Sequence, residues 1–245
     1  MPDAPELSIV VPCYNEEKNV PRLVERFASA LAGRSGVEVV FVDNGSKDGT
    51  GAALDAAVSR HAFVRKAVVP ENQGYGFGIL CGLREARGQV LAWTHADLQA
   101  DPSDVLKAYD AYRAAARETQ KVLVKGHRRG RKPSEKFFSW GMQVLAGLAL
   151  GFAVEEVNAQ PKLFPRLFLG ELENPPHDFS LDLYVLYMAE KKGYKIISIP
   201  VFFEERLHGE AKGGSGSSWP VRWKLMKRSF AYIFELRSQL QRKAA

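Results

Sequence analysis

Continuous apolar runs alternate with helical patterns along the N-terminal part of the chain, and this alternation constrains the fold more than any other feature. The apolar runs cover residues 7–11, 37–42, 63–69 and 90–93. Runs that are apolar at every position indicate strands buried on both faces, as in parallel sheets covered by helices. Apolar residues at helical spacing predict intervening helices over about 19–32, 51–59 and up to residue 86. The βαβαβαβ order predicts an α/β fold, a doubly wound, mostly parallel, Rossmann-like sheet with right-handed crossovers.

Polar loops follow three of the predicted strands, at residues 12–17, 43–50 and 94–102. Ligands of doubly wound sheets bind in the crevice beyond the carboxyl ends of the strands. We therefore expect these three loops to converge on one pocket.

The third loop carries His95, Asp97 and Gln99 at alternate positions before Pro102 ends strand pairing. Alternation places the three side chains on one face while the backbone is extended. A carboxylate, an imidazole and an amide oxygen in that arrangement can hold a divalent cation against a diphosphate. A polar loop after a core strand is the alternative interpretation.

The composition is that of a globular protein with an anionic partner. The chain has 245 residues, 46% of them hydrophobic, and a net charge of +6. This length can bury a sizeable core, and the charge suits nucleotide phosphates, a phospholipid surface or nucleic acid. Cys13 and Cys81 are too far apart to indicate a disulfide framework or a zinc site and fit a reducing compartment. Because the N-terminus lacks a signal-peptide pattern, we expect a cytoplasmic location.

Gly74, Gly76 and Gly78 superficially resemble a dinucleotide-binding fingerprint. Their spacing differs from it, and they follow the third predicted strand rather than the first. We expect these glycines to let the start of a helix lie close to the sheet.

Five motifs, in this order and spacing, resemble those of the family 2 glycosyltransferases with a GT-A fold, especially the dolichyl- or polyprenyl-phosphate sugar synthases. The motifs lie at residues 11–17, 42–50, 72–74, 86–88 and 95–102. Each motif is weak when taken singly. The resemblance extends to about residue 212 and implies one GT-A domain over residues 1–212.

The resemblance implies that the first loops bind a nucleoside-diphosphate sugar, with UDP or GDP as the nucleotide. Pro12, Tyr14 and Glu16 would line the nucleotide together with Asn72, and Asp43 would accept a hydrogen bond from the base. An ionised carboxylate only accepts hydrogen bonds and therefore suits a base N–H. The alternative for Asp43 is a turn-forming residue that bonds its own backbone.

A basic loop near residue 210 resembles a family segment that closes over the donor diphosphate. Arg206 and Lys212 would add positive charge there, and Ala211 stands where the family carries serine.

The resemblance also assigns the metal. The family motif is Asp-Ala-Asp-Leu-Gln, and this chain carries His95 at the first position. Asp97, assisted by Gln99, would bind Mg²⁺ or Mn²⁺ that bridges the donor phosphates. Imidazole suits transition metals better than Mg²⁺, so His95 either favours Mn²⁺ or turns away from the metal to contact phosphate.

The acceptor side is predicted from a basic run at residues 127–132. By resemblance, Arg128 contacts the acceptor phosphate, and a solvated surface loop is the alternative. Nucleic-acid binding is disfavoured because the run lacks interleaved aromatic residues. Residues 137–154 are uncharged but interrupted by glycines. Ser139 in that segment and Lys162 beyond it are expected near a lipid acceptor, and residues 137–154 either face the membrane or form ordinary core.

A helix over about 178–192, followed by a strand over 194–201, carries Asp182 near the expected acceptor. Asp178 or Ser180 can cap this helix. Asp182 is a candidate base for a hydroxyl acceptor, whereas a phosphate acceptor is already anionic and needs none.

The C-terminal part is predicted as a flexible linker at 213–218 and a basic amphipathic helix at 219–245. Such a helix suits a membrane surface. Docking on the domain, or on a second copy in a homo-oligomer, is the alternative.

These patterns favour an inverting glycosyltransferase that transfers a sugar to a polyprenyl phosphate, peripheral on the cytoplasmic face of the membrane, in cell envelope polysaccharide synthesis. A metal-dependent transferase acting on a glycan or lipid hydroxyl is the second hypothesis. A non-catalytic nucleotide-sugar or membrane-binding module is the third.

Overall fold

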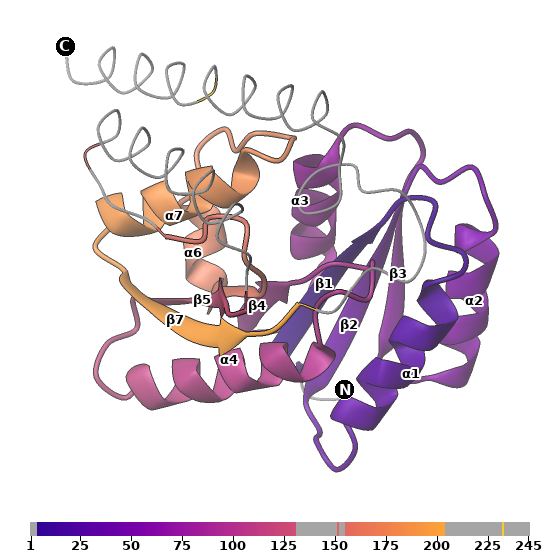
Figure 1. The fold of residues 1–245 in the computed structure, drawn as a ribbon, viewed down its shortest axis with the longest axis horizontal. Helices are drawn as coiled ribbons and strands as arrows, with labels where there is room; N and C mark the ends of the chain where they lie inside the picture. Colours follow the sequence, from indigo (N-terminus) through magenta and orange to yellow (C-terminus); the bar gives the residue numbers. More distant parts are fainter. Residues whose placement is uncertain (1–3, 131–150, 152–154, 204–231, 233–245) are drawn as a thin grey trace.

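The computed structural model describes residues 4–130, 151, 155–203 and 232. Within them, a seven-stranded mixed sheet carries helices on both faces (Figure 1). The strands are β1 (Leu7–Cys13), β2 (Val37–Asn44), β3 (Val64–Val69), β4 (Val90–Trp93), β5 (Val122–Arg128), β6 (Lys162–Pro165) and β7 (Lys195–Val201). The helices are α1 (Val20–Ala30), α2 (Thr50–Arg60), α3 (Tyr75–Glu85), α4 (Pro102–Ala115), α6 (Arg166–Gly170) and α7 (Leu181–Lys191).

The sheet has the strand order β3-β2-β1-β4-β6-β5-β7. Strands β3, β2, β1 and β4 are parallel, which confirms the predicted βαβαβαβ unit. Strand β6 runs antiparallel to both β4 and β5, so the sheet is mixed in its second half. Strand β6 could not be predicted from the sequence, because a four-residue strand that begins with a lysine shows too short a pattern to recognise.

Alternate residues of the central strands enter two cores on opposite faces of the sheet. Val10 of β1 faces a core formed with α3, α6 and α7. Its neighbours Ile9 and Val11 face a core formed with α1, α2 and α4. This alternation is the reason that the strands are apolar at nearly every position: both faces are covered and neither meets water.

The glycines that precede and begin α3 allow two close approaches. A Cβ on Gly78 would lie 2.8 Å from Asn44 Nδ2 at the end of β2, so this glycine brings α3 close to the sheet as predicted. Gly74 and Gly76 instead face the backbone of residues 176–178, where the carbonyl oxygen of His177 would lie 2.4 Å from a Cβ on Gly74. The expectation that all three glycines approach the sheet was therefore wrong for two of them.

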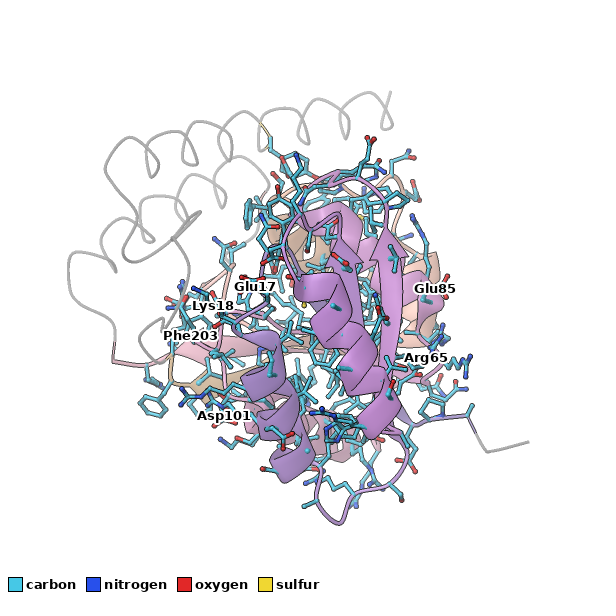
Figure 2. All side chains as sticks on the ribbon, turned by 90° about the vertical axis from the view of Figure 1, so that its right-hand side faces the viewer. Glu17, Lys18, Arg65, Glu85, Asp101 and Phe203 are labelled. Atoms are coloured by element: carbon cyan, nitrogen blue, oxygen red, sulfur yellow. The ribbon has the colours of Figure 1, made fainter. Side chains whose placement is uncertain are left out.

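The motif at residues 86–88 lies at the far end of the sheet and has a structural role. Ser8 Oγ accepts the Gly88 N–H at 2.7 Å and donates to Glu38 Oε1 at 2.6 Å. Arg65 bonds the same carboxylate and the Glu85 carbonyl, and Figure 2 shows Arg65 beside Glu85. Burial alone would raise the pKa of Glu38, but the hydrogen bonds from Ser8, the Arg87 N–H and Arg65 together lower it.

Several predictions fall on residues outside the described part of the chain. They are the roles of Ser139, Arg206 and Lys212, the segment 137–154, the linker 213–218 and nearly all of the helix 219–245. Tyr232 is described, lies in a helix, and packs part-buried against the core that contains α3 and α7. Over the described ranges, no helix has the length and hydropathy needed to cross a membrane.

Candidate active site

The first two polar loops are joined by backbone-to-side-chain hydrogen bonds. Strands β1 and β2 end side by side, with Cys13 paired to Asp43, so the loops leave the sheet together. The Glu16 N–H donates to Thr50 Oγ1 at 2.8 Å, and the Gly49 N–H donates to Glu17 Oε2 at 2.8 Å. The Lys47 N–H donates to Asn15 Oδ1 at 2.9 Å. The predicted convergence of loops 12–17 and 43–50 is therefore confirmed.

Carboxylates gather where these two loops meet. Burial raises the pKa of the Cys13 thiol, and the charges of Glu16, Asp43 and Asp48 raise it further. Asp48 accepts hydrogen bonds from the N–H and the hydroxyl of Thr50. Ionised carboxylates only accept hydrogen bonds. A cluster of them therefore suits the N–H and hydroxyl donors of a nucleoside better than the phosphates of a nucleotide.

Asp43 adopts the turn-forming role that was its alternative interpretation. Its Oδ1 accepts the Ser46 N–H at 3.1 Å, which closes the turn after β2. Contact with a base stays a prediction for this carboxylate. The other expected nucleotide residues lie in the same region: Pro12 and Tyr14 are half-buried at the end of β1, and Asn72 is exposed in the loop before α3.

The loop after β4 shows the predicted alternation. His95, Asp97 and Gln99 are partly exposed, while Ala96, Leu98 and Ala100 between them are buried. Asp97 Oδ1 accepts the Gln99 N–H at 3.2 Å across Leu98. The three polar side chains therefore share the outward face of the loop.

This loop leaves the sheet beside the donor-side loops. Val10 of β1 is paired with Trp93 of β4, and the Thr94 N–H donates to the Val10 carbonyl at 3.0 Å. Strand β1 lies between β2 and β4, and the three strands are parallel, so all three polar loops leave the sheet at the carboxyl ends of neighbouring strands. Their joint use in one site follows the general behaviour of doubly wound sheets.

A buried polar network lies behind the third loop. Asp182 Oδ1 accepts hydrogen bonds from Gln160 Nε2 at 2.8 Å and from Lys162 Nζ at 3.0 Å. Gln160 also donates to the Tyr75 hydroxyl at 3.2 Å. The side chains of Lys162 and Asp182 are 0% and 3% exposed. The network joins α3, the segment before β6, β6 itself and α7.

The ammonium of Lys162 makes all its hydrogen bonds inside the protein. Its ammonium also donates to the carbonyls of Val157 and Ala159, at 2.7 and 2.9 Å. An ammonium has three donors, and these two bonds with the Asp182 bond use all three. The structure therefore places Lys162 as the partner of Asp182, and its predicted contact with an acceptor stays a prediction.

His95 lies within the electrostatic reach of this network. Desolvation lowers the pKa of His95, the charges of Asp97 and Asp182 oppose this, and Lys162 and Arg128 lower it further. Its ring centroid lies 5.9 Å from that of Tyr75. Burial therefore favours the neutral imidazole, which can present a lone pair.

Arg128 reaches the same region from the end of β5. Its Nε donates to Glu156 Oε2 at 2.6 Å, and its guanidinium lies 5.6 Å from the centre of the Phe203 ring. Lys125, three residues earlier, is paired across the sheet with Lys162 and bonds the Glu155 carbonyl. Burial lowers the pKa of Lys125 to about 8, and the charge of Lys162 contributes. Three cations, Lys125, Arg128 and Lys162, therefore lie near two buried carboxylates, those of Glu156 and Asp182.

Two buried oxygens near the network find no hydrogen-bond partner within the described residues, Gln160 Oε1 and Thr94 Oγ1. Buried polar atoms in this state are usually satisfied by a water molecule or a ligand. Gln160 and Tyr75 were not predicted as site residues. Each is a single polar residue in a loop or at a helix start, and only the tertiary fold brings them to Asp182.

The residues present fit a metal that is shared with a substrate. In the described part of the chain, no three His, Cys, Asp or Glu side chains are grouped so that they could hold a metal ion. Asp97 supplies one carboxylate, and His95 a neutral imidazole. Cations that bind nucleotide phosphates commonly take only one or two protein carboxylates, because phosphate oxygens and water complete their coordination.

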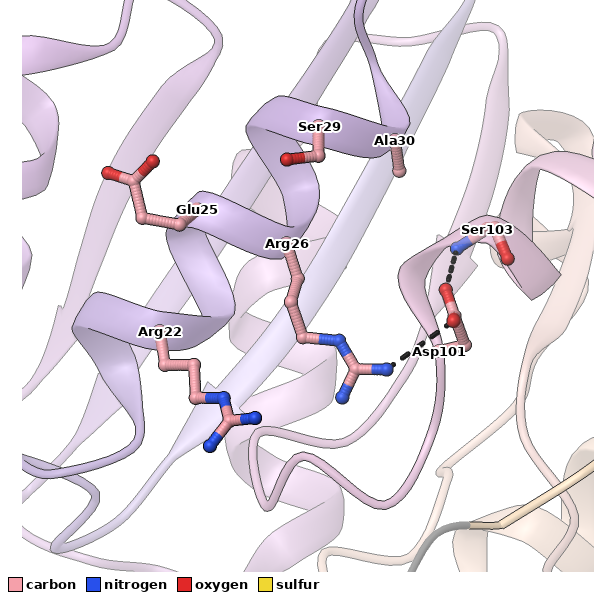
Figure 3. A pocket seen from close by; sticks show the side chains of 7 residues that line it. All are labelled: Arg22, Glu25, Arg26, Ser29, Ala30, Asp101 and Ser103. Carbon is pink, nitrogen blue, oxygen red and sulfur yellow. Dashed lines mark hydrogen bonds and ion pairs between the residues drawn. The ribbon is translucent and has the colours of Figure 1, made fainter.

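A solvent-open hollow of about 460 Å³ lies outside this region, between α1 and the start of α4 (Figure 3). It is lined by Arg22, Glu25, Arg26, Ser29, Ala30, Asp101 and Ser103. None of these residues was predicted to bind donor, acceptor or metal. The hollow borders Asp101, at the end of the loop that carries Asp97.

The fold is that of the GT-A glycosyltransferases. Glucosyl-3-phosphoglycerate synthase from Mycobacterium tuberculosis, solved with Mn²⁺, UDP and glucosyl-3-phosphoglycerate, superposes with a TM-score of 0.70 at 19% identity, covering 95% of this chain and 80% of that chain. A mannosyltransferase from Pyrobaculum calidifontis, solved with GDP-Man and Mn²⁺, gives a TM-score of 0.64 at 21% identity, covering 95% and 70%.

The family is shown by the sequence. The model of Glycosyl transferase family 2 matches residues 8–179, so the protein belongs to that family. A dolichyl-phosphate beta-glucosyltransferase of Trichomonas vaginalis is 28% identical over 212 residues, which cover 81% of this chain and 66% of the relative. A dodecaprenyl-phosphate galacturonate synthase of Rhizobium johnstonii is 27% identical over 239 residues, covering 95% and 69%. The chain thus spans about two thirds of the length of these relatives.

Proposed function

We propose that the protein is an inverting glycosyltransferase that transfers a sugar from a UDP-sugar or GDP-sugar to a polyprenyl phosphate at the cytoplasmic face of a membrane. The observation that carries this proposal is the cationic end of β5, where Arg128 lies within electrostatic reach of the loop with His95 and Asp97. A cation beside the donor site suits an acceptor that is itself an anion. The names of the relatives, which act on dolichyl and dodecaprenyl phosphates, point to the same acceptor class.

The state of Asp182 supports phosphate rather than hydroxyl as the attacking group. A hydroxyl acceptor requires a base, and Asp182 was the candidate for that role. Its Oδ1 already accepts hydrogen bonds from Lys162 and Gln160, so this oxygen is committed to two donors inside the protein. A phosphate oxygen is a nucleophile without deprotonation, so this site needs no such base.

The donor would lie across the loops that follow β1, β2 and β4. Glu16 and Asp43 would face the nucleoside, with Pro12, Tyr14 and Asn72 lining it. Asp97, with Gln99 and His95, would hold Mn²⁺ or Mg²⁺ against the diphosphate, and that cation would offset the charge that develops on the departing nucleoside diphosphate. Arg128 would orient the acceptor phosphate.

The test is a transfer assay with paired acceptors. The purified protein is incubated with UDP- and GDP-sugars, Mn²⁺, and either a short polyprenyl phosphate or the matching polyprenol in detergent. We expect product only with the phosphate, and loss of product when Arg128 becomes Met. Transfer to the polyprenol alone would support a hydroxyl acceptor and contradict the proposal. Binding of nucleotide without transfer to either acceptor would support a non-catalytic module.

Substitution of Asp182 does not separate these functions unless folding is measured as well. Asp182→Asn removes the charge that neutralises buried Lys162, so activity can fall because the protein is destabilised. The thermal midpoint of the variant therefore has to accompany its rate. A variant that keeps its stability and loses transfer would restore Asp182 as a base.

A further inference from the structure

The loop that carries Asp97 contains a residue in an unusual backbone conformation. Leu98 has a φ of 61°, in the left-handed region that non-glycine residues seldom adopt. Its side chain is fully buried, and Asp97 and Gln99 on either side point outward. The direction of the Asp97 carboxylate therefore depends on whatever holds Leu98 in this conformation.

Arg26 of α1 contacts this loop at two residues, Leu98 and Asp101. Its Nη1 donates to the Leu98 carbonyl at 3.2 Å, and its Nη2 lies 3.3 Å from Asp101 Oδ2 (Figure 3). The planar guanidinium of Arg26 thus contacts both Leu98, the residue with positive φ, and Asp101, the N-cap of α4. Asp101 in turn caps α4 by accepting the Ser103 N–H at 2.7 Å.

The same helix is tied to the donor-side loops. The N–H groups of Asn19 and Val20 donate to the Glu16 carbonyl at 2.9 Å, and Asn19 Nδ2 donates to Glu16 Oε2 at 2.6 Å. Helix α1 therefore carries a contact to the predicted nucleotide loop at its start and a contact to the predicted metal loop nearly two turns later, at Arg26. A rigid helix with contacts at both points fixes the two loops relative to each other.

We infer that Arg26 is a positioning residue for the cation and donor diphosphate: through Leu98 and Asp101 it sets the orientation of Asp97. This inference rests on the proposed metal role of Asp97. Residues that orient a metal ligand without touching the metal commonly change metal affinity by about 10- to 100-fold when they are removed. Arg26→Ala should therefore weaken binding of the metal–nucleotide pair, although Arg26 itself contacts neither.

The experiment is a Mn²⁺ titration followed by electron paramagnetic resonance, in which the signal of free Mn²⁺ falls as the ion binds. It is carried out on the full chain with UDP and, separately, with GDP. We expect the wild type to bind Mn²⁺ with one nucleotide and Arg26→Ala to bind it at least about tenfold more weakly. Arg26→Lys, which can reach only one of the two partners, should fall between them.

Two other arginines, Arg22 on α1 and Arg34 just after it, are matched controls. Arg22 lines the same hollow one helical turn earlier, so Arg22→Ala removes the same charge from the same helix face. Arg34, in the segment after α1, donates to Asp110 of α4 at 3.0 and 3.2 Å, so Arg34→Ala breaks an ion pair to α4 that is remote from Leu98. Both controls should bind Mn²⁺ within about twofold of the wild type, because Arg22 is exposed and the Arg34–Asp110 pair is exposed as well.

The outcomes separate this inference from the proposed function. Equal binding by Arg26→Ala and the wild type would overturn the positioning role and leave the proposed function standing. A wild type that binds no Mn²⁺ with either nucleotide would overturn the metal role of Asp97, and the inference with it. If Arg26→Ala melts at too low a temperature to titrate, the comparison of Arg26→Lys with Arg22→Lys decides in its place.

Discussion

The donor-side loops and the acceptor-side network are both polar, but they are held together in different ways. Loops 12–17 and 43–50 are joined by backbone N–H groups that donate to side-chain oxygens, several of them near solvent, such as Gly49 N–H to Glu17 Oε2. The acceptor side depends on a buried charge pair, Lys162 with Asp182. Hydrogen bonds near solvent contribute modestly one by one, whereas a buried charge that loses its partner is costly. Single substitutions should therefore be tolerated on the donor side and destructive on the acceptor side.

The largest expected effect is on the acceptor side. Lys162→Met leaves Asp182 buried without its cation, and we expect the free energy of unfolding to fall by about 3 to 5 kcal/mol. Urea denaturation measures this. Lys195→Met is the matched control, because its pair with Glu118 is exposed and contributes less than about 1 kcal/mol. The double variant Lys162→Met with Asp182→Leu should recover most of the loss, and a double variant as unstable as the single one would contradict the explanation.

Asp97 should affect the reaction rather than the fold. Asp97→Ala removes the carboxylate assigned to the cation, so we expect the transfer rate to fall by at least roughly a hundredfold, since metal-centred charge stabilisation contributes several kcal/mol. Its thermal midpoint should stay close to that of the wild type, because Asp97 is partly exposed. Asp110→Asn is a control in an exposed pair on α4. An unchanged rate in Asp97→Ala would remove the cation from the proposal.

Because Lys125 is a buried cation on the acceptor side, we expect the free energy of unfolding to depend on pH through this residue. Burial lowers its pKa to about 8, below the value of an unfolded lysine. Between about pH 8 and pH 10 the unfolded state therefore binds more protons than the folded state, and stability rises with pH. Relative to Lys125→Met, we expect the wild type to gain about 1 to 2 kcal/mol over this interval, because each pH unit contributes at most about 1.4 kcal/mol. A constant difference between the two proteins from pH 7 to 10 would count against this buried cation.

The smallest expected effect is on the donor side. Thr50→Val preserves shape but removes the acceptor of the Glu16 N–H and the donor to Asp48, so we expect a loss of about 1 kcal/mol. Ser59→Ala removes an exposed hydroxyl from the same helix and should change stability by less than about 0.5 kcal/mol. Thermal denaturation of the two variants makes the comparison. A loss in Thr50→Val as large as that in Lys162→Met would erase the proposed difference between the two regions.

The two regions also differ in how far they could be predicted. The meeting of the donor-side loops could be predicted because they directly follow apolar strands, and parallel pairing brings consecutive loops to one end of the sheet. The alternation of His95, Asp97 and Gln99 was likewise visible as a local pattern, and the structure keeps it. On the acceptor side, Lys162 was expected to meet the acceptor, and the structure uses all its donors internally. Gln160, which donates to the same carboxylate, was not predicted as a site residue.

The sequence by itself determined the parallel half of the sheet, the edge at which the polar loops gather and the family of the protein. These follow from local periodicity and from motifs that are contiguous in the chain, and such signals survive without knowledge of distant contacts. The tertiary structure alone decided that strand β6 runs antiparallel, that Lys162 neutralises Asp182, and that Arg26 grips the loop of Asp97. Each of these joins residues from separate elements, and the energy of a buried charge or a strained backbone depends on neighbours that no local pattern specifies.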